Sequence, residues 1–413
     1  METNKRPTML WHGCRPEQLA RRFRQYERDD CNYHTAELND IIAEMEDILC
    51  RLFARAEIIW ATPLTQGFSG AVVLKVQPSY PVCGGARPVV VKLGHTRMIE
   101  QEYQRYQMYV RYFIGNGHNT VVLDWTCNTD MGGIVYSFIG ADIGTKADNV
   151  KDFGSFYARS SSAQIKQVLA NLFRNTCGLW YANQNLLQPL DLTSDYRCLF
   201  KYSIEQLEQL VSRRLPSVVF HPRLTFTSLP TTPVRTFTNP FRMIAKMQPF
   251  VYPSYTAITH GDFNPHNILI DQNYCSWLLD FQSTRPSHIL RDVAMLDAVI
   301  RFQLLYAHEA TLEERLAMEE ALCSVTHFSQ LDSLEAHMPG DNPAIAKAFT
   351  TAVHLRLLAR WIVEKNPMAE INEYYVALLY ATLNTLRFAS LESVQREHAL
   401  LSASLLIDLL SLN

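Results

Sequence analysis

The chain has 413 residues, which is long for one compact core and suits two domains or two lobes. Hydrophobic residues make up 47% and charged residues 19% of the sequence, a globular composition that excludes disorder on a large scale. The 38 basic and 41 acidic side chains leave a net charge of −3, which argues against a protein built mainly to bind a nucleic-acid backbone.

Cysteine usage and apolar segments indicate the compartment. Nine scattered cysteines without a C-x-x-C pair favour reduced thiols over disulfides or a zinc site. The N-terminus lacks the apolar core of a signal peptide. The apolar stretch 400–412 is too short to span a bilayer and contains Asp408, so we expect a core helix there. We therefore expect a cytoplasmic protein without a membrane segment.

The pattern of apolar residues changes early in the chain. Between Leu38 and Leu52 they recur at three- and four-residue spacing, which forms one face of a helix. We expect residues 1–55 to form a helical N-terminal extension. Short β-branched runs follow at 71–76 and 89–93, joined by a segment rich in proline and glycine, and they predict two strands.

A helix is predicted from 97 to 113, and a further strand at 133–138 leads into a glycine-containing stretch, with a candidate hinge near 139–144. From about residue 152 onward the pattern is mainly helical. The segment 216–240, rich in proline and threonine, interrupts it, and we expect a long surface loop there. A small strand-rich part thus precedes a larger helical part.

The most informative segment reads THGDFNPHNILID from Thr259, followed by WLLDF from Trp277. Phosphoryl transfer needs a carboxylate that orients the acceptor hydroxyl and oxygen ligands that hold Mg²⁺ against the phosphates. Asp262 suits the first role, and Asn267 and Asp280 suit the second. We expect a β-hairpin between Asn267 and Asp280, because it would fold the chain back and bring the two side chains together.

This segment resembles the catalytic loop of aminoglycoside phosphotransferases and related small-molecule kinases, in which H-G-D-x-x-x-x-N precedes an aspartate within I/L-D-F/W. The resemblance extends to RDVA, whose Asp292 it implies braces the catalytic loop. It covers about residues 56–310. A narrower similarity to bacterial ternary-complex-associated kinase-like domains lies in three segments: GFSG from Gly67, EYQRY from Glu102 and HILRD from His288.

The resemblance implies an ATP site upstream of the catalytic loop. Gly67, Ser69 and Gly70 lie in a turn before a strand, where backbone N–H groups can approach phosphate oxygens. The turn contains neither a Walker A sequence nor a full G-x-G-x-x-G. Adenine would contact the inter-lobe connection, with Tyr136 and Phe138 presenting backbone N–H and C=O groups to the base.

Lys92 ends a β-branched strand and resembles the kinase lysine that neutralises the α- and β-phosphates. Such a lysine needs an acidic partner on the next helix. At about 100° per residue, Glu102 falls beside the apolar stripe of that helix, whereas Glu100 points toward the opposite flank. We therefore expect an ion pair between Lys92 and Glu102.

Two other features of the sequence point to different metal sites. His260, Asp262, His266 and Asp280 could form the metal cluster of a hydrolase, but the upstream nucleotide signals argue against it. We assign His260 to loop support. The tripeptide DFG from Asp152 spells the metal-binding motif of protein kinases, yet it precedes the catalytic loop, whereas the metal-binding aspartate must follow it.

Together these signals predict an α+β, bilobal protein-kinase-like fold. We expect a small antiparallel-sheet N-lobe over 56–139 and a larger, mainly helical C-lobe over 140–413. The expected function is ATP- and Mg²⁺-dependent transfer of the γ-phosphate to a hydroxyl of a small molecule or protein. Two alternatives stay open: a nucleotide-binding pseudokinase or interaction module without turnover, and AMP transfer to a protein. We expect no nucleic-acid partner, and leave a protein partner open through the N-terminal extension or the C-lobe.

No pattern identifies the acceptor. An aminoglycoside would favour a strongly acidic cleft. Four carboxylates between residues 313 and 320 are candidates, but we interpret them as the solvated face of a helix: Glu313, Glu314, Glu319 and Glu320.

Overall fold

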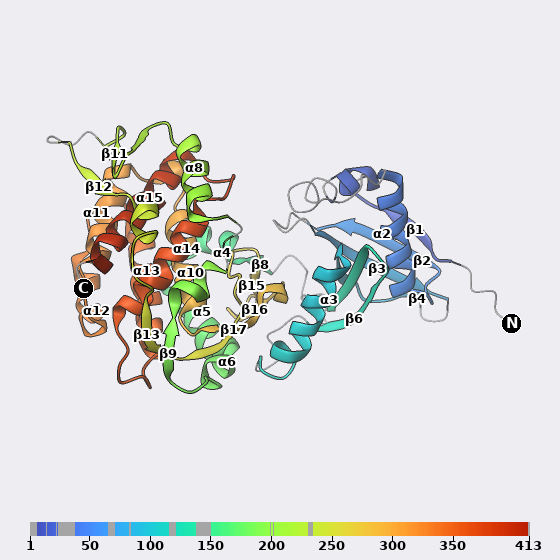
Figure 1. Ribbon diagram of the computed structural model, residues 1–413. Coiled ribbons are helices and arrows are strands. Elements are labelled where there is room, and N and C mark those ends of the chain that lie inside the picture. Colours follow the sequence, from blue (N-terminus) through green and yellow to red (C-terminus); the bar gives the residue numbers. More distant parts are fainter. Residues whose placement is uncertain are drawn as a thin grey trace. The chain divides into compact units, whose positions relative to one another are not determined.

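In the computed structural model the chain folds into two compact units. The first comprises residues 1–151 and 268–284, and the second comprises residues 152–267 and 285–413. The chain therefore passes between the units three times. Figure 1 shows both units, with many of their elements labelled. The structure describes residues 6–13, 15–21, 23, 38–64, 71–81, 84–114, 121–137, 150–198, 200, 202–229 and 234–411.

The first unit is built on a seven-stranded sheet with the order β1-β2-β3-β5-β7-β6, and β4 also pairs with β3. All neighbours are antiparallel except β1, which runs parallel to β2. The sheet is therefore mixed, whereas the sequence predicted an antiparallel one. Its strands are β1 (Thr8–Trp11), β2 (Ile58–Pro63), β3 (Val72–Tyr80), β4 (Gly84–Gly85), β5 (Val89–His95), β6 (Val122–Cys127) and β7 (Met131–Ser137).

Helices α2 (Leu38–Leu52) and α3 (Thr96–Arg105) cover opposite faces of this sheet. Gly132 and Gly133 are consecutive residues of β7, and neighbouring residues of a strand face opposite sides of the sheet. One of them therefore faces α3 and the other faces α2. A Cβ added to Gly132 would lie 2.9 Å from the Cβ of Ile99 in α3. A Cβ added to Gly133 would lie 2.6 Å from the Cγ2 of Ile48 in α2. Each helix thus approaches the sheet more closely than a side chain on β7 would allow.

The N-terminal residues belong to the sheet-bearing unit, and here the structure differs from the expected separate helical extension. β1 adds a strand at the sheet edge, with Thr8 opposite Ile58. In α2, Met45 and Ile48 share one hydrophobic core with sheet residues such as Leu74. A four-residue strand is too short for a periodic signal, and its pairing with a strand some 50 residues later is invisible to a local pattern.

The returning segment 268–284 adds a hairpin to the first unit. β15 (Ile268–Ile270) pairs antiparallel with β16 (Ser276–Leu278), with Ile268 opposite Leu278, as the sequence predicted. A short 3₁₀ turn, η5 (Phe281–Ser283), follows, and the Phe281 ring packs 5.9 Å from the ring of Tyr106. Tyr106 begins the π-helical turn η1 (Tyr106–Val110) that continues α3.

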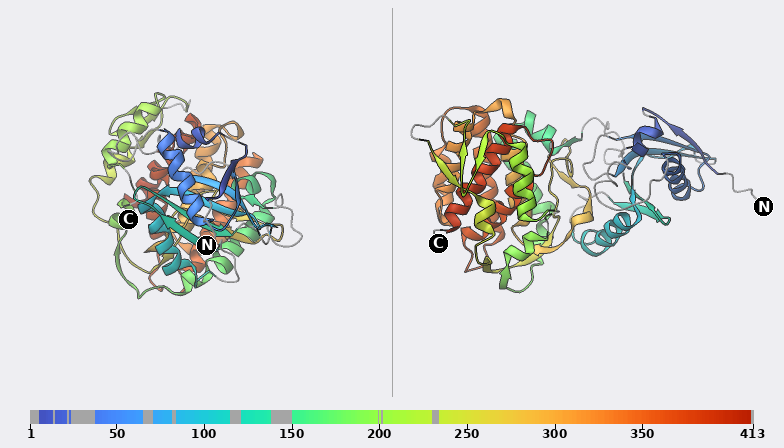
Figure 2. Two further views of the ribbon diagram at one scale, coloured as in Figure 1. Left: turned by 90° about the vertical axis from the view of Figure 1, so that its right-hand side faces the viewer. Right: turned by 45° about the horizontal axis from the view of Figure 1, so that its top comes forward.

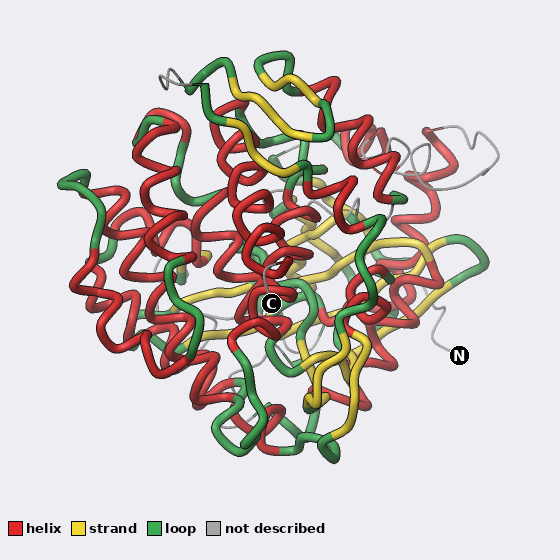
Figure 3. The backbone as a smooth tube through the Cα atoms, turned by 60° about the vertical axis from the view of Figure 1, so that its left-hand side comes forward, coloured by secondary structure: helices red, strands yellow, loops and turns green. Residues whose placement is uncertain are grey.

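The second unit is mainly helical. Figure 3, in which helices are red, shows its long helices packed against one another, and in Figure 2 the longest of them are orange to red. The C-terminal helix was predicted as a core helix, and most of its residues are buried. The helices are α4 (Phe153–Arg159), α5 (Ser162–Ala170), η4 (Asn171–Thr176), α6 (Gly178–Ala182), α7 (Leu192–Arg197), α8 (Ile204–Arg214), α9 (Pro240–Ile244), α10 (Arg291–Phe302), α11 (Leu312–Cys323), α12 (Leu331–Leu334), α13 (Pro343–Ile362), α14 (Ile371–Thr385) and α15 (Ser393–Ser411).

Short strands also belong to this unit. β14 (Thr256–Thr259) pairs with β17 (Arg285–His288), and β13 (Val251–Ser254) pairs with β9 (Gln188–Asp191). The long loop expected over 216–240 is wrong, because this segment contains a three-stranded sheet. Its strands are β10 (Val218–Phe220), β11 (Arg223–Phe226) and β12 (Thr236–Thr238). Val, Phe and Thr give these runs their strand preference despite the prolines between them.

A buried charge cluster joins three helices of the second unit. Glu319 of α11 pairs with Arg301 of α10 and with His398 of α15, and all three side chains are inaccessible to solvent. Asp297 of α10 pairs with the same arginine. The interpretation of the α11 carboxylates as a solvated face is therefore wrong for Glu319. Among the described residues, no helix has the length and apolarity needed to span a membrane.

Candidate active site

Lys92 lies on the central strand β5 of the first unit and is 4% exposed. Its Nζ lies 2.8 Å from Oε2 of Glu102, which is 1% exposed and comes from α3. The ion pair predicted from the sequence is present. The same Nζ lies 2.9 Å from Oδ2 of Asp280, at the end of the returning hairpin. One ammonium group is thus shared by two carboxylates.

Burial alone would lower the pKa of Lys92, but the carboxylates of Asp280 and Glu102 outweigh it and raise the pKa above its usual value. The ammonium group therefore stays charged at any physiological pH. A buried charge of this kind is stable only while its partners are ionised and close.

Tyr136 fixes the other oxygen of the glutamate. Its hydroxyl donates a hydrogen bond to Oε1 of Glu102. Burial, followed by the neighbouring charge of Glu102, raises the pKa of Tyr136 well above 10, so the phenol keeps its proton. The sequence predicts Tyr136 only as a backbone contact for a nucleotide, and no local pattern indicates this side-chain role.

Asp280 has a left-handed backbone, with φ 61°. A non-glycine residue in this region is uncommon and carries a conformational cost, which the surrounding structure must offset. Its side chain accepts a hydrogen bond from the N–H of Gln282 at the start of η5, besides the ion pair with Lys92. The hairpin, the turn and the lysine together hold this carboxylate in place.

The catalytic-loop motif lies in the second unit and is anchored by Asp292 of α10. The N–H groups of His260 and Gly261 donate to the two carboxylate oxygens of Asp292 at 2.7 and 2.8 Å. Burial raises the pKa of Asp292, against the lowering effect of His260, these N–H donors and Arg291. Arg291 in turn donates to the carbonyl of Gly261 at 3.1 Å. The loop is therefore tied to the first turn of α10.

Asp262 is half-buried, and two amide side chains hold its carboxylate. Asn267 Nδ2 donates to Oδ2 of Asp262 at 3.1 Å and to its carbonyl at 3.0 Å. Asn264 Nδ2 donates to the same Oδ2 at 3.2 Å. The N–H of Asp262 lies 3.4 Å from Nδ1 of His260. The sequence did not predict a role for Asn264, although it lies between Asp262 and Asn267 in the motif.

The predicted residues thus fall into two groups. Lys92, Glu102, Tyr136 and Asp280 meet inside the first unit. Asp262 and Asn267 meet inside the second unit. The remaining predicted residues lie outside the described part of the chain: Gly67, Ser69, Gly70 and Phe138.

No group of three or more His, Cys, Asp or Glu side chains among the described residues is placed to hold a metal ion. The hydrolase cluster considered above therefore gains no support. A Mg²⁺ site needs fewer protein ligands, because the ion binds one or two protein oxygens and completes its coordination shell with phosphate and water. Asn267 meets that demand, since its amide nitrogen is engaged and its Oδ1 accepts no hydrogen bond from another described residue.

Comparison with protein families gives one match, to the family described as ternary complex associated domain 9. The match covers residues 58–197 and 206–387, which is more than half of the chain. A search of curated proteins found no match.

Solved structures of aminoglycoside phosphotransferases are also similar. Aminoglycoside phosphotransferase APH(3'')-Id from Streptomyces rimosus is 15% identical, with a TM-score of 0.35, covering 76% of this chain and 98% of that one. A thermostable mutant of aminoglycoside phosphotransferase APH(4)-Ia, in a ternary complex with ADP and hygromycin B, is 9% identical. Its TM-score is 0.38, and the match covers 88% of this chain and 97% of that one.

Proposed function

We propose that this chain, which belongs to the ternary complex associated domain 9 family, is an ATP- and Mg²⁺-dependent phosphotransferase that acts on a hydroxyl group. Its fold is α+β and protein-kinase-like, with a sheet-bearing unit and a mainly helical unit, as the sequence predicted. The observation that carries the proposal is the buried lysine shared by two carboxylates, Lys92 with Glu102 and Asp280.

Lys92 would neutralise the phosphates of the nucleotide. A lysine buried without a ligand needs balancing charge, and Glu102 supplies it while leaving the ammonium fixed in position. Tyr136 in turn holds Glu102. A positively charged group fixed in position stabilises phosphate more than the ammonium of a mobile surface lysine does, because it needs no reorganisation when phosphate binds.

Asp280 and Asn267 would hold Mg²⁺, which would supply charge neutralisation at the phosphates when bound. Asp280 offers a carboxylate that now faces the ammonium of Lys92. Asn267 offers an amide oxygen whose direction is fixed by the two hydrogen bonds of its nitrogen. Both are the hard oxygen donors that this ion prefers.

Asp262 would act on the acceptor. The acceptor oxygen bonds to the γ-phosphorus as the bond from that phosphorus to the bridging oxygen breaks, ADP leaves, and Asp262 takes the hydroxyl proton. Asn264 and Asn267 both donate to Oδ2 of this carboxylate and so fix its plane. Positioning and charge neutralisation are sufficient for this chemistry.

The base and the phosphate turn are proposed from sequence position. Backbone groups at Tyr136 and Phe138 would contact adenine, and the turn with Gly67, Ser69 and Gly70 would approach the phosphates. The solved phosphotransferase complex with ADP and hygromycin B contains a nucleotide and an aminoglycoside. For this chain we propose the nucleotide and leave the acceptor class to a transfer screen.

The test combines binding with turnover. ATP with Mg²⁺ should raise the melting temperature of the purified chain, and the chain should consume ATP only when Mg²⁺ is present. A screen across sugars, amino alcohols and proteins, read by mass spectrometry, should find products heavier by a phosphate. Products heavier by AMP, or a chain that ATP and Mg²⁺ do not stabilise, would reject the proposal.

A further inference from the structure

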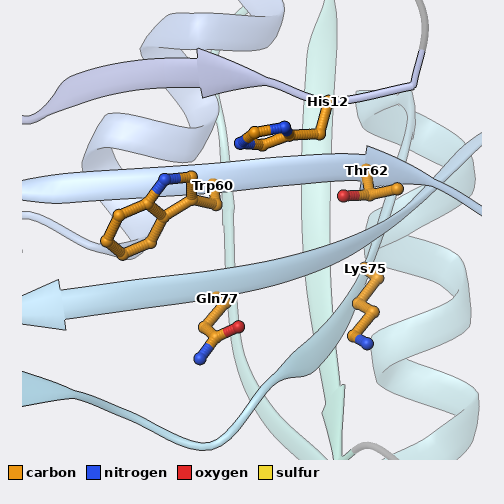
Figure 4. Close-up of a pocket in the computed structure, with 5 residues that line it drawn as sticks. All are labelled: His12, Trp60, Thr62, Lys75 and Gln77. Atoms are coloured by element: carbon orange, nitrogen blue, oxygen red, sulfur yellow. The ribbon is translucent and has the colours of Figure 1, made fainter.

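A polar cavity of about 420 Å³ lies on the sheet of the first unit, apart from the residues placed in the active site above. It is lined by side chains from three neighbouring strands. Figure 4 shows them: His12 just after β1, Trp60 and Thr62 on β2, and Lys75 and Gln77 on β3.

Strand register explains why these side chains meet. Trp60 lies opposite Gln77 and Thr62 lies opposite Lys75, so the four form two cross-strand pairs on one face. The residues between them, such as Ala61 and Val76, point the other way into the core that contains α2. The cavity therefore opens on the face of the sheet opposite α2.

The lining has the chemistry of a site for an anion with a flat ring. The indole of Trp60 is partly buried and offers an apolar surface for stacking. Lys75 offers a cation, and none of the described residues that line the cavity is acidic. Thr62 and Gln77 add neutral hydrogen-bonding groups.

Three of these groups are available to a ligand. Within the described ranges, the side chains of Trp60, Thr62 and Gln77 form no hydrogen bond or ion pair with another residue. A few convergent polar groups beside an aromatic surface are typical of small-molecule sites. Water can satisfy the same polar groups, but it gains nothing from the indole face.

The cavity and the charged group at Lys92 lie on the same face of the sheet but are formed by different residues. On β5, Val90 pairs with Lys75 and Lys92 pairs with Val73, so the two lysines project from the same sheet face on neighbouring strands. Lys92 is neutralised by Glu102 and Asp280, and neither carboxylate lines the cavity. A ligand of the cavity would therefore meet the charge of Lys75 without competing for that ion pair.

We propose that this cavity binds a small aromatic carboxylate. The flat ring stacks on Trp60, the carboxylate pairs with the ammonium of Lys75, and Thr62 and Gln77 complete its hydrogen bonds. The site stands whether or not the chain transfers phosphate, because none of its lining residues belongs to the proposed catalytic group.

Three probes separate the ring from the charge. 2-Naphthoate carries both, 2-naphthamide lacks the charge, and cyclohexanecarboxylate lacks the flat ring. Calorimetric titration of the full chain should give one site for 2-naphthoate, with the other two probes binding at least tenfold more weakly. Equal affinity for 2-naphthoate and 2-naphthamide would overturn the proposal.

Variants assign the binding to this cavity. Lys75→Gln and Trp60→Leu should each weaken 2-naphthoate at least tenfold, while Trp60→Phe should keep most of the affinity, which excludes misfolding as the cause. Lys246→Gln makes the same change at an exposed lysine of the second unit and should bind as the parent does. Asp280→Asn should also bind as the parent does, and a loss there would overturn the proposal by placing the probe in the nucleotide site.

Discussion

Lys92 and Asp280 form an ion pair of 2.9 Å although residues 152–267 of the second unit lie between β5 and the returning hairpin in the sequence. Glu102 pairs with the same ammonium, at 2.8 Å. The two carboxylates are therefore held near each other only because one lysine lies between them. Removing that lysine leaves two like charges facing a common gap.

Lys92→Met should destabilise the chain as well as weaken nucleotide binding. Removal of one partner from a buried ion pair costs about 3–5 kcal/mol, because the remaining charge is left uncompensated. Adding Glu102→Gln should restore part of the loss, since it removes one of the two unpaired carboxylates. Urea unfolding checks both variants. Lys246→Met, at an exposed lysine, is the control, and an equal loss there would contradict the argument.

Asp262→Asn should abolish phosphate transfer while leaving nucleotide binding intact. The asparagine keeps the shape of the side chain but cannot take a proton from the acceptor, and Lys92 lies in the other unit. We expect a loss of at least a hundredfold in turnover, as for removal of a general base, with an unchanged ATP-induced rise in melting temperature. Full turnover in this variant would remove Asp262 from the mechanism.

Asp292→Ala should loosen the catalytic loop. The substitution leaves the buried N–H groups of His260 and Gly261 without acceptors, which we expect to cost roughly 2–4 kcal/mol of unfolding free energy. Asp332→Ala is the control, because its ion pair with Arg360 is exposed and should contribute little to stability. Urea unfolding of both variants gives the comparison, and equal losses would refute the anchoring role.

Gly133→Ala should disturb the packing of α2 on the sheet. The added Cβ would lie 2.6 Å from Cγ2 of Ile48 and 3.0 Å from Cδ1 of Leu52, so strand or helix must shift. Overpacking of this kind costs about 1–3 kcal/mol. In Gly178→Ala the added Cβ meets no atom within 4 Å beyond its chain neighbours and its own helix backbone, so the melting temperature should be unchanged or slightly higher. Thermal unfolding distinguishes the two glycines.

Stability should fall in mild acid because of His398. Burial lowers the pKa of His398 to about 4, although Glu319 opposes the shift. A guanidinium nitrogen of Arg315 faces Nδ1 at 3.3 Å, and Nε2 lies 2.9 Å from Glu319, so the neutral ring accepts from one and donates to the other. A second ring proton would face Arg315 donor to donor.

The sign of the pH effect follows from the two pKa values. In the unfolded chain the ring protonates near pH 6.5, while in the folded chain it protonates only near pH 4. The stability linked to His398 is therefore complete above pH 6.5 and is lost as the pH falls toward 4. Between about pH 7.5 and pH 5 the loss should be about 2 kcal/mol. His398→Gln should flatten this part of the urea-unfolding profile, and an unchanged slope would contradict it.

Features carried by local patterns were predictable. The periodicity of α3 favoured Glu102 over Glu100 as the partner of Lys92. The spacing of the motif indicated the position of Asp262 and of the hairpin that follows Asn267. Features that depend on distant segments were not. The pairing of β1 with β2 leaves no local signal, and Glu319 looked like a solvated carboxylate because Arg301 and His398 come from other helices.

The side chain of Tyr136 shows the same limit at the site itself. Its place at the end of a strand indicated a backbone role, and only the fold brings its hydroxyl to Glu102. Residues whose chemical role belongs to a recognisable motif can be predicted from the sequence. Residues that act by holding another residue through a tertiary contact, as Tyr136 holds Glu102, cannot be predicted in this way.

The return of residues 268–284 to the first unit affects how the chain can be divided. A fragment ending at residue 151 would contain every strand of the seven-stranded sheet and both of its helices, yet it would lack Asp280. Lys92 would then keep one carboxylate instead of two. The sheet-bearing unit cannot be exchanged between relatives as one continuous cassette, and a recombination point placed at residue 151 would join a lysine from one parent to an aspartate from another.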